Sequence, residues 1–176
     1  MNNWLNERTI FLKTLEGKEI SCWVGAEMAF SEGVEPEEIW FDESVPYLQM
    51  TILYFVTKSE EIYKVRDYQA DDLFGLLIEP VAKIEKWCPQ DSTIWRWREV
   101  DELPLGIITS ASYSLFEERL LNRINLNIVG KSINLVAGEV EMLSEGQFKI
   151  YTEDESVLVQ VDGAHPKNLE QVRVVD

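Results

Sequence analysis

Alternation of apolar and polar residues recurs along this chain and predicts strands. The order SVLVQVDG (156–163) is typical of a strand with one face in solvent. Residues 50–56, by contrast, are almost wholly apolar and rich in β-branched and aromatic side chains. This composition predicts a central strand buried on both faces, paired through the turn TKSEE (57–61) with residues 62–66.

Several further short strands are expected on both sides of this pair. Two strand-like runs in TIFLKTLEGKEISCWVG flank Glu16 and Gly17, which predicts a hairpin there. Towards the C-terminus, Gly130 and Gly138 separate the runs INLNIV, SINLVA and EVEML, and TEDE separates FKIY from SVLVQV. Strands of this length and spacing indicate a mainly β fold, either an antiparallel meander or a partly closed barrel.

Two segments have the spacing of helices. Residues 115–124 follow Ser114, which with Glu117 has the spacing of a capping box, and an apolar stripe recurs at helical intervals through Leu120 and Ile124. This predicts a short helix over 115–124. Residues 70–78 have apolar positions at helical intervals too, but LFGLLI also suits a buried strand, so the second helix has a strand as its alternative.

The stretch TIWRWREV (93–100) has an unusual alternation of tryptophan and arginine. In a strand, Trp95 and Trp97 share one face while Arg96 and Arg98 share the other. Burying each ring is worth on the order of 5 kcal/mol as an upper estimate, so we expect the tryptophans to face the core. The arginines would then face outward, where acids such as Asp101 and Glu102 can screen them. The alternative is that both rings line a ligand pocket or a partner-binding surface.

Size and composition suit one globular domain over residues 1–176, with 45% hydrophobic residues. The outlying property is charge, because 16 Lys and Arg stand against 32 Asp and Glu, a net charge of −16. A field of this sign repels phosphate backbones and anionic lipid surfaces, and it attracts basic proteins. We therefore expect no binding to nucleic acid or membrane.

Acids are concentrated in one stretch, since residues 19–57 contain eight acids and no Lys or Arg. A local surface of a single sign is a candidate docking site. We expect the partner-binding residues in this stretch, with the tryptophan as the apolar anchor: Glu35, Glu37, Glu38, Trp40, Asp42 and Glu43.

Residues for familiar catalytic chemistry are scarce. The single histidine, His165, lies beside Pro166 in an apparent turn, and the two cysteines, Cys22 and Cys88, have no metal-binding spacing. Neither a phosphate-binding P-loop nor a dinucleotide fingerprint is present. We accordingly assign no catalytic residue, metal or cofactor, and an enzymatic role is not favoured.

These observations lead to three functional hypotheses. The first is a small acidic, non-enzymatic interaction protein of the immunity, inhibitor or mimic type, which binds a basic protein partner. The second is a β-barrel or cupped sheet that binds a small ligand beside Trp95 and Trp97. The third is a hydrolase that uses two carboxylates. Neither a signal peptide nor a long apolar span is found, so the expected location is cytoplasmic, and a homodimer through a strand edge remains open.

Overall fold

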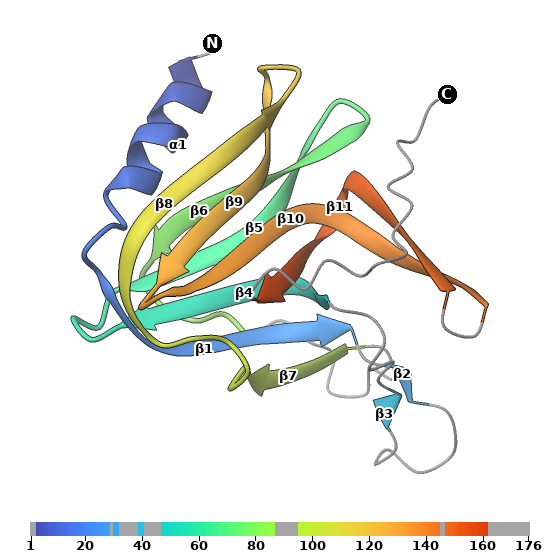
Figure 1. Ribbon diagram of the computed structural model, residues 1–176, viewed down its shortest axis with the longest axis horizontal. Coiled ribbons are helices and arrows are strands. Elements are labelled where there is room, and N and C mark those ends of the chain that lie inside the picture. The colour runs from blue at the N-terminus through green and yellow to red at the C-terminus, as the bar shows by residue number, and fades with distance from the viewer. Residues whose placement is uncertain are drawn as a thin grey trace.

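Antiparallel strands dominate the computed structural model of the protein, which describes residues 3–28, 30–31, 39–40, 47–86, 95–144 and 147–161 (Figure 1). The mainly β prediction is thereby confirmed. The helix and strands, in chain order, are α1 (Asn3–Lys13), β1 (Glu19–Met28), β2 (Phe30–Ser31), β3 (Ile39–Trp40), β4 (Leu48–Thr57), β5 (Ile62–Ala70), β6 (Leu73–Val81), β7 (Trp95–Glu99), β8 (Gly106–Phe116), β9 (Leu120–Ile128), β10 (Lys131–Ser144) and β11 (Gln147–Val161).

Nine of these strands form one sheet, in the order β6-β5-β4-β11-β10-β9-β8-β1-β7. An additional pairing joins β4 to β1, so the six strands from β4 through β1 close into a ring. The β5–β6 hairpin extends from β4, and β7 lies on β1 beyond the segment where β8 pairs. The predicted partly closed barrel is therefore correct. The predicted hairpin of residues 50–56 with 62–66 is confirmed as β4 and β5.

The inner face of this ring is filled by apolar side chains from nearly every strand. Trp23 of β1, Phe55 of β4 and Tyr63 of β5 are buried in a row, with a tilted Trp23–Phe55 contact at 5.2 Å and a stacked Phe55–Tyr63 contact at 4.8 Å between ring centroids. Helix α1 contacts β8 and β6, and its Leu5 and Leu12 join the same cluster. Burial of this cluster is the main favourable term in the stability of the fold.

The predicted helix over 115–124 is wrong, because these residues form the end of β8, a turn and the start of β9. Glu117 and Glu118 have φ angles of +48° and +57°, and the amide of Arg119 donates to the carbonyl of Phe116 at 3.1 Å. Two successive left-handed residues give the turn that suits the twist of a hairpin. Pairing with β10 and packing in the ring outweigh the local helical preference of this segment.

Residues 70–78 likewise form strand structure, most of it in β6, so the second predicted helix is wrong and its strand alternative is correct. Gly75 pairs with Tyr68 across the β5–β6 ladder. A Cβ atom at position 75 would lie 2.7 Å from the Tyr68 ring, so the glycine leaves room for the cross-strand aromatic side chain.

The hairpin predicted around Gly17 is wrong on its N-terminal side. The run containing Thr9 and Leu12 is the last part of α1, whose Leu5, Thr9 and Leu12 form a buried stripe at helical spacing. Gly17 then adopts a φ of +86°, and its amide donates to the carbonyl of Ile108. The described part of the chain contains no helix long and apolar enough to cross a bilayer.

The breaks predicted at Gly138 and at TEDE are irregularities within long strands. The β10–β11 register moves from Ala137↔Val157 to Gly138↔Thr152, so four residues of β11 have no opposite partner in β10. Such a bulge bends the strand pair without ending it. Within it, Glu153 and Ser156 have φ angles of +62° and +100°.

Candidate functional site

Strand β7 contains most of the tryptophan–arginine stretch and lies at one end of the sheet order. It pairs antiparallel with β1, with Arg98 opposite Gly25, Trp97 opposite Ala26 and Arg96 opposite Glu27. Residues directly opposite each other in a ladder project to the same side of the sheet. The β1–β4 ladder then shows which side each residue of β7 faces.

The arginines of β7 point to the inner side of the sheet, contrary to the sequence-based expectation. Arg96 is opposite Glu27, which is in turn opposite Met50, a buried member of the inner cluster. Trp97 is opposite Ala26, which pairs with Ile52 on the outer side. The predicted alternation of faces is correct, whereas the assignment of the tryptophan face to the main core is wrong.

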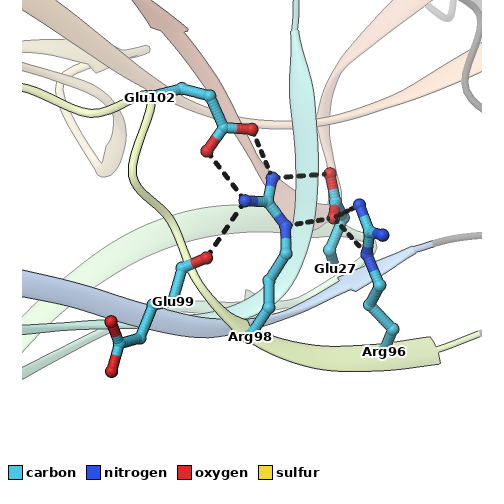
Figure 2. Close-up of polar contacts among 5 residues, drawn as sticks. All are labelled: Glu27, Arg96, Arg98, Glu99 and Glu102. Carbon is cyan, nitrogen blue, oxygen red and sulfur yellow. Dashed lines mark hydrogen bonds and ion pairs between the residues drawn. The ribbon is translucent and has the colours of Figure 1, made fainter.

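Glu27 holds both arginines. Its side chain is 1% exposed, and both guanidinium groups converge on its carboxylate (Figure 2). Oε2 accepts bonds from Arg96 Nε at 3.1 Å, Arg96 Nη2 at 3.0 Å and Arg98 Nε at 2.6 Å. Oε1 accepts a bond from Arg98 Nη2 at 3.2 Å. A buried carboxylate is tolerated here because charged donors replace the water that it loses.

Arg98 is the central residue of this cluster, since its guanidinium also binds Glu102 through two bonds. Nη1 and Nη2 donate to the Glu102 carboxylate at 2.7 Å and 2.8 Å, and Nη1 donates to the carbonyl of Glu99 at 3.1 Å. Burial disfavours the charge on Arg98, but the bonds to Glu102 and Glu27 outweigh it and raise the pKa of the guanidinium. The bond from Arg98 lowers the pKa of the Glu102 carboxyl. Glu27, Arg96, Arg98 and Glu102 are called the ionic clasp below.

Trp97 lies on the outer side of the sheet, where it packs with a small second cluster. Its ring centroid is 5.9 Å from that of Tyr54, and buried Ala26 and Ile52 complete the contact. Trp95 is opposite Met28 and, by strand alternation, shares the face of Trp97. A ligand site between these tryptophans would therefore lie on the outer surface of the sheet and not inside the ring.

Most of the predicted partner-binding residues lie outside the described ranges. These are Glu35, Glu37, Glu38, Asp42 and Glu43. The backbone of Trp40 is placed, and it pairs with Phe30 in the two-stranded β2–β3 sheet. That sheet follows β1 directly in sequence, so the acidic stretch starts from the strand that carries Glu27.

The described acids lie overwhelmingly at the surface. The only ones that are buried are Glu27 and Glu153, and the latter accepts bonds from Asn122 and Thr152. One group of acids lies close together around Glu139. Burial raises the pKa of the Glu139 carboxyl, and the charges of Asp154, Glu155 and Glu141 raise it further.

The described structure brings none of the residues considered for nucleophilic catalysis together into a catalytic arrangement. Cys22 is a free, partly buried thiol. Burial and the nearby Glu99 raise its pKa, which keeps the thiol protonated and weakly nucleophilic. His165 and Cys88 lie outside the described ranges. Within those ranges, no group of three or more His, Cys, Asp or Glu side chains could hold a metal ion.

The residue that sequence reasoning missed is Glu27. It was one of eight acids in the Lys- and Arg-free stretch, and only the β1–β7 register reveals that it is opposite Arg96. A signal was present, because two arginines at alternate positions of a strand need an anionic partner if that face is buried. Comparison of the chain with models of protein families, with curated proteins and with solved structures found no match.

Proposed function

We propose that this protein is a non-enzymatic interaction module that binds a basic surface of a partner protein. The observation that carries the proposal is the combination of a net charge of −16 with the near absence of buried acids among the described residues. Among the described residues, the negative charge thus lies almost wholly at the surface. A surface of this kind steers a positively charged partner during encounter and disfavours neutral or acidic competitors.

The balance of ion pairs supports this proposal. Several cations among the described residues are paired with acids of the same chain, as in Lys18–Glu61, Arg66–Glu79 and Arg98–Glu102. At Glu139, burial raises the pKa of the carboxyl, and repulsion from the nearby acids Asp154, Glu155 and Glu141 raises it further. Bringing a basic partner close relieves part of this repulsion, which adds to the driving force for association.

The first test is capture of partners from the lysate of the source cells at low and at high salt. The proposal predicts a single stoichiometric protein that is basic and is released by salt, because the Debye length shortens as ionic strength rises. Capture of only acidic or neutral proteins, or capture that salt does not weaken, contradicts the proposal.

A charge-reversal variant then locates the site on the captured partner. E35K/E37K/E38K changes three acids of the expected site, and E60K/D72K/E118K makes the same change of net charge at exposed turn residues. Each exposed charge pair at the rim of an interface contributes about 1 kcal/mol or less to the binding free energy. We therefore expect the dissociation constant to rise by at least about tenfold more for the first variant than for the second. Equal weakening would mean that net charge acts without a localised site, and unchanged affinity in both would refute the proposal.

A further inference from the structure

We infer that the free edge of β7 is a docking site for an extended, basic segment of a partner protein, which pairs with this strand as an additional strand of the sheet. The inference rests on the proposed function and specifies where and how the partner binds. It identifies the partner segment by its chemistry, namely an extended backbone with basic side chains. Strand addition of this kind draws its affinity from main-chain hydrogen bonds at an exposed sheet edge.

The register of β7 shows which of its backbone groups point to the free edge. The amide of Val100 donates to the carbonyl of Trp23 at 3.0 Å, which makes these two residues a hydrogen-bonded pair. Hydrogen-bonded and non-hydrogen-bonded pairs alternate along an antiparallel ladder. Arg98 and Arg96 therefore bond to β1, whereas the N–H and C=O groups of Trp97 and Glu99 point away from it.

The contact of Arg98 with Glu99 agrees with this assignment. Arg98 Nη1 donates to the backbone carbonyl of Glu99, which is therefore not bonded to β1. The groups that remain for a partner strand are the N–H and C=O of Trp97 and the N–H of Glu99. Among the described residues, no backbone or side-chain hydrogen bond engages these three groups.

Two other strand edges in the described part of the chain carry features that hinder pairing. The free side of β8 is capped at Ala111, whose carbonyl accepts a bond from Lys13 Nζ at 2.7 Å and whose amide donates to Glu16 Oε1 at 3.0 Å. The outer strand β6 contains Pro80, which has no N–H to offer. Proline and charged side chains at edges are common ways to prevent unwanted strand pairing. Strand β7 contains no proline, and its two arginines turn inward to Glu27, so its exposed charged side chain is the acid Glu99.

The charge around this edge favours a basic occupant. On and around β7 there are two arginines and four acids, and the acids are Glu27, Glu99, Asp101 and Glu102. Glu99 and Asp101 are exposed, and the Glu102 side chain is half exposed. A partner strand would place a basic side chain within reach of Glu99, and an apolar one beside Trp97 on the outer face. A second copy of this acidic chain would bring further acids to the same place.

The experiment uses the full ¹⁵N-labelled chain and a blocked eight-residue peptide that alternates lysine with valine. Amide hydrogen exchange is measured by NMR at low salt, with and without saturating peptide. The expected result is protection of the Trp97 and Glu99 amides by about tenfold or more, while the Arg98 amide, already bonded to β1, changes little. A peptide that alternates glutamate with valine is the matched control and should give no protection.

Two variants separate the backbone contribution from that of the indole. Both W97P and W97V remove the indole ring, but only W97P removes the outward-facing N–H. Proline is acceptable here because this N–H takes no part in the β1 ladder. We expect the dissociation constant of the lysine peptide to be about fivefold higher for W97P than for W97V, the loss expected for one main-chain hydrogen bond. Cooperative urea unfolding of both variants is the control for folding.

Three results of the exchange experiment would overturn the inference. The first is that the lysine peptide does not bind, and the second is that it binds without protecting the Trp97 amide. The third is protection that rises with protein concentration in the absence of peptide, which would assign the edge to a second copy of the chain. If the captured partner is sensitive to E35K/E37K/E38K but insensitive to W97P, the inference fails while the proposed function stands. A protein that captures no basic partner fails both.

Discussion

The inside of the ring and the β1–β7 pair are held together by different forces. Inside the ring, Phe55, Leu53 and Met50 are buried among other apolar side chains, and their packing needs no specific partner atom. At the β1–β7 pair, the inner face is occupied by the ionic clasp, in which each charge needs its counterpart at hydrogen-bond distance. Apolar packing tolerates small rearrangements, whereas a desolvated charge does not tolerate the loss of its partner.

This difference explains why β7 can be both firmly attached and open. Only five residues of β7 pair with β1, and β7 has no second strand on its other side within the described structure. A short strand without a second neighbour is weakly held by its backbone bonds alone. The ionic clasp adds side-chain bonds between β7 and β1 on the inner face of the sheet. These bonds leave the free edge of β7 available for pairing with another strand. The predictions below test this division, from the largest expected effect to the smallest.

Truncation inside the ring should have the largest effect. Phe55 is fully buried between Trp23 and Tyr63, and F55A removes the central ring of this stack. We expect a loss of about 4 kcal/mol in the free energy of unfolding, because the site loses its transfer free energy and gains a cavity. Urea unfolding monitored by circular dichroism measures it. The half-exposed Ile107 offers a control, and a comparable loss in I107A would contradict the account of the ring.

Removal of the buried charge of the clasp should come next. E27Q leaves Arg96 and Arg98 facing a neutral amide, and we expect a loss of about 3 kcal/mol in the free energy of unfolding, the cost of an unpaired buried charge. Replacing Glu27 and both arginines, as E27Q/R96M/R98M, should recover part of that loss because no buried charge is left unpaired, and the half-exposed Glu102 that loses Arg98 is solvated. A triple variant that is less stable than E27Q would show that the arginines stabilise β7 independently of Glu27.

Neutralisation of the exposed acid of the clasp should cost less than about 1 kcal/mol at pH 7, since the Glu102 side chain is 52% exposed. Because Arg98 lowers the pKa of Glu102 in the folded state, its charged form stabilises the fold. The deficit of E102Q should be complete at neutral pH, start to shrink below the ordinary value of 4.5 and vanish once the pH has fallen through the folded-state pKa. Urea unfolding at several pH values provides the check, and a deficit independent of pH would contradict it.

The smallest effect should have the opposite sign. Burial and nearby acids raise the pKa of Glu139 above 4.5, so its charged form destabilises the folded state. E139Q should therefore increase stability at pH 7, by less than about 1 kcal/mol, and the gain should disappear below pH 4.5, where the carboxyl is protonated in both states. Paired unfolding curves of E102Q and E139Q give this contrast, and a loss of stability in E139Q at pH 7 would show that repulsion at Glu139 is unimportant.

Local signals in the sequence were sufficient for some elements and misleading for others. The apolar run of β4 and the turn before β5 lie within one short segment, and their pairing was predicted correctly. Residues 115–124 also have a strong local pattern, but positive φ angles at Glu117 and Glu118 fold it into a hairpin. The choice between helix and hairpin for this segment depends on the pairing of β9 with β10. That pairing is a tertiary contact, which the local pattern does not encode.

The clasp could not be predicted for a related reason. Glu27 and Arg96 are separated by 69 residues, and their contact depends on the register of β1 with β7. A slip of one residue in that register would reverse the faces of β7. The sequence revealed the alternation of tryptophan and arginine, and the buried acid on the neighbouring strand determined which of them turned inward.

The central claim is that β7 is clasped on its inner face and open along its outer edge. The most direct measurement is amide hydrogen exchange of the free protein, resolved at each residue of β7 by NMR. The account predicts strong protection of the Arg96 and Arg98 amides, which bond to β1, and fast exchange of the Trp97 and Glu99 amides between them. Equal protection at all four positions, at low and at high protein concentration, would show that another part of the chain covers this edge and would contradict the account.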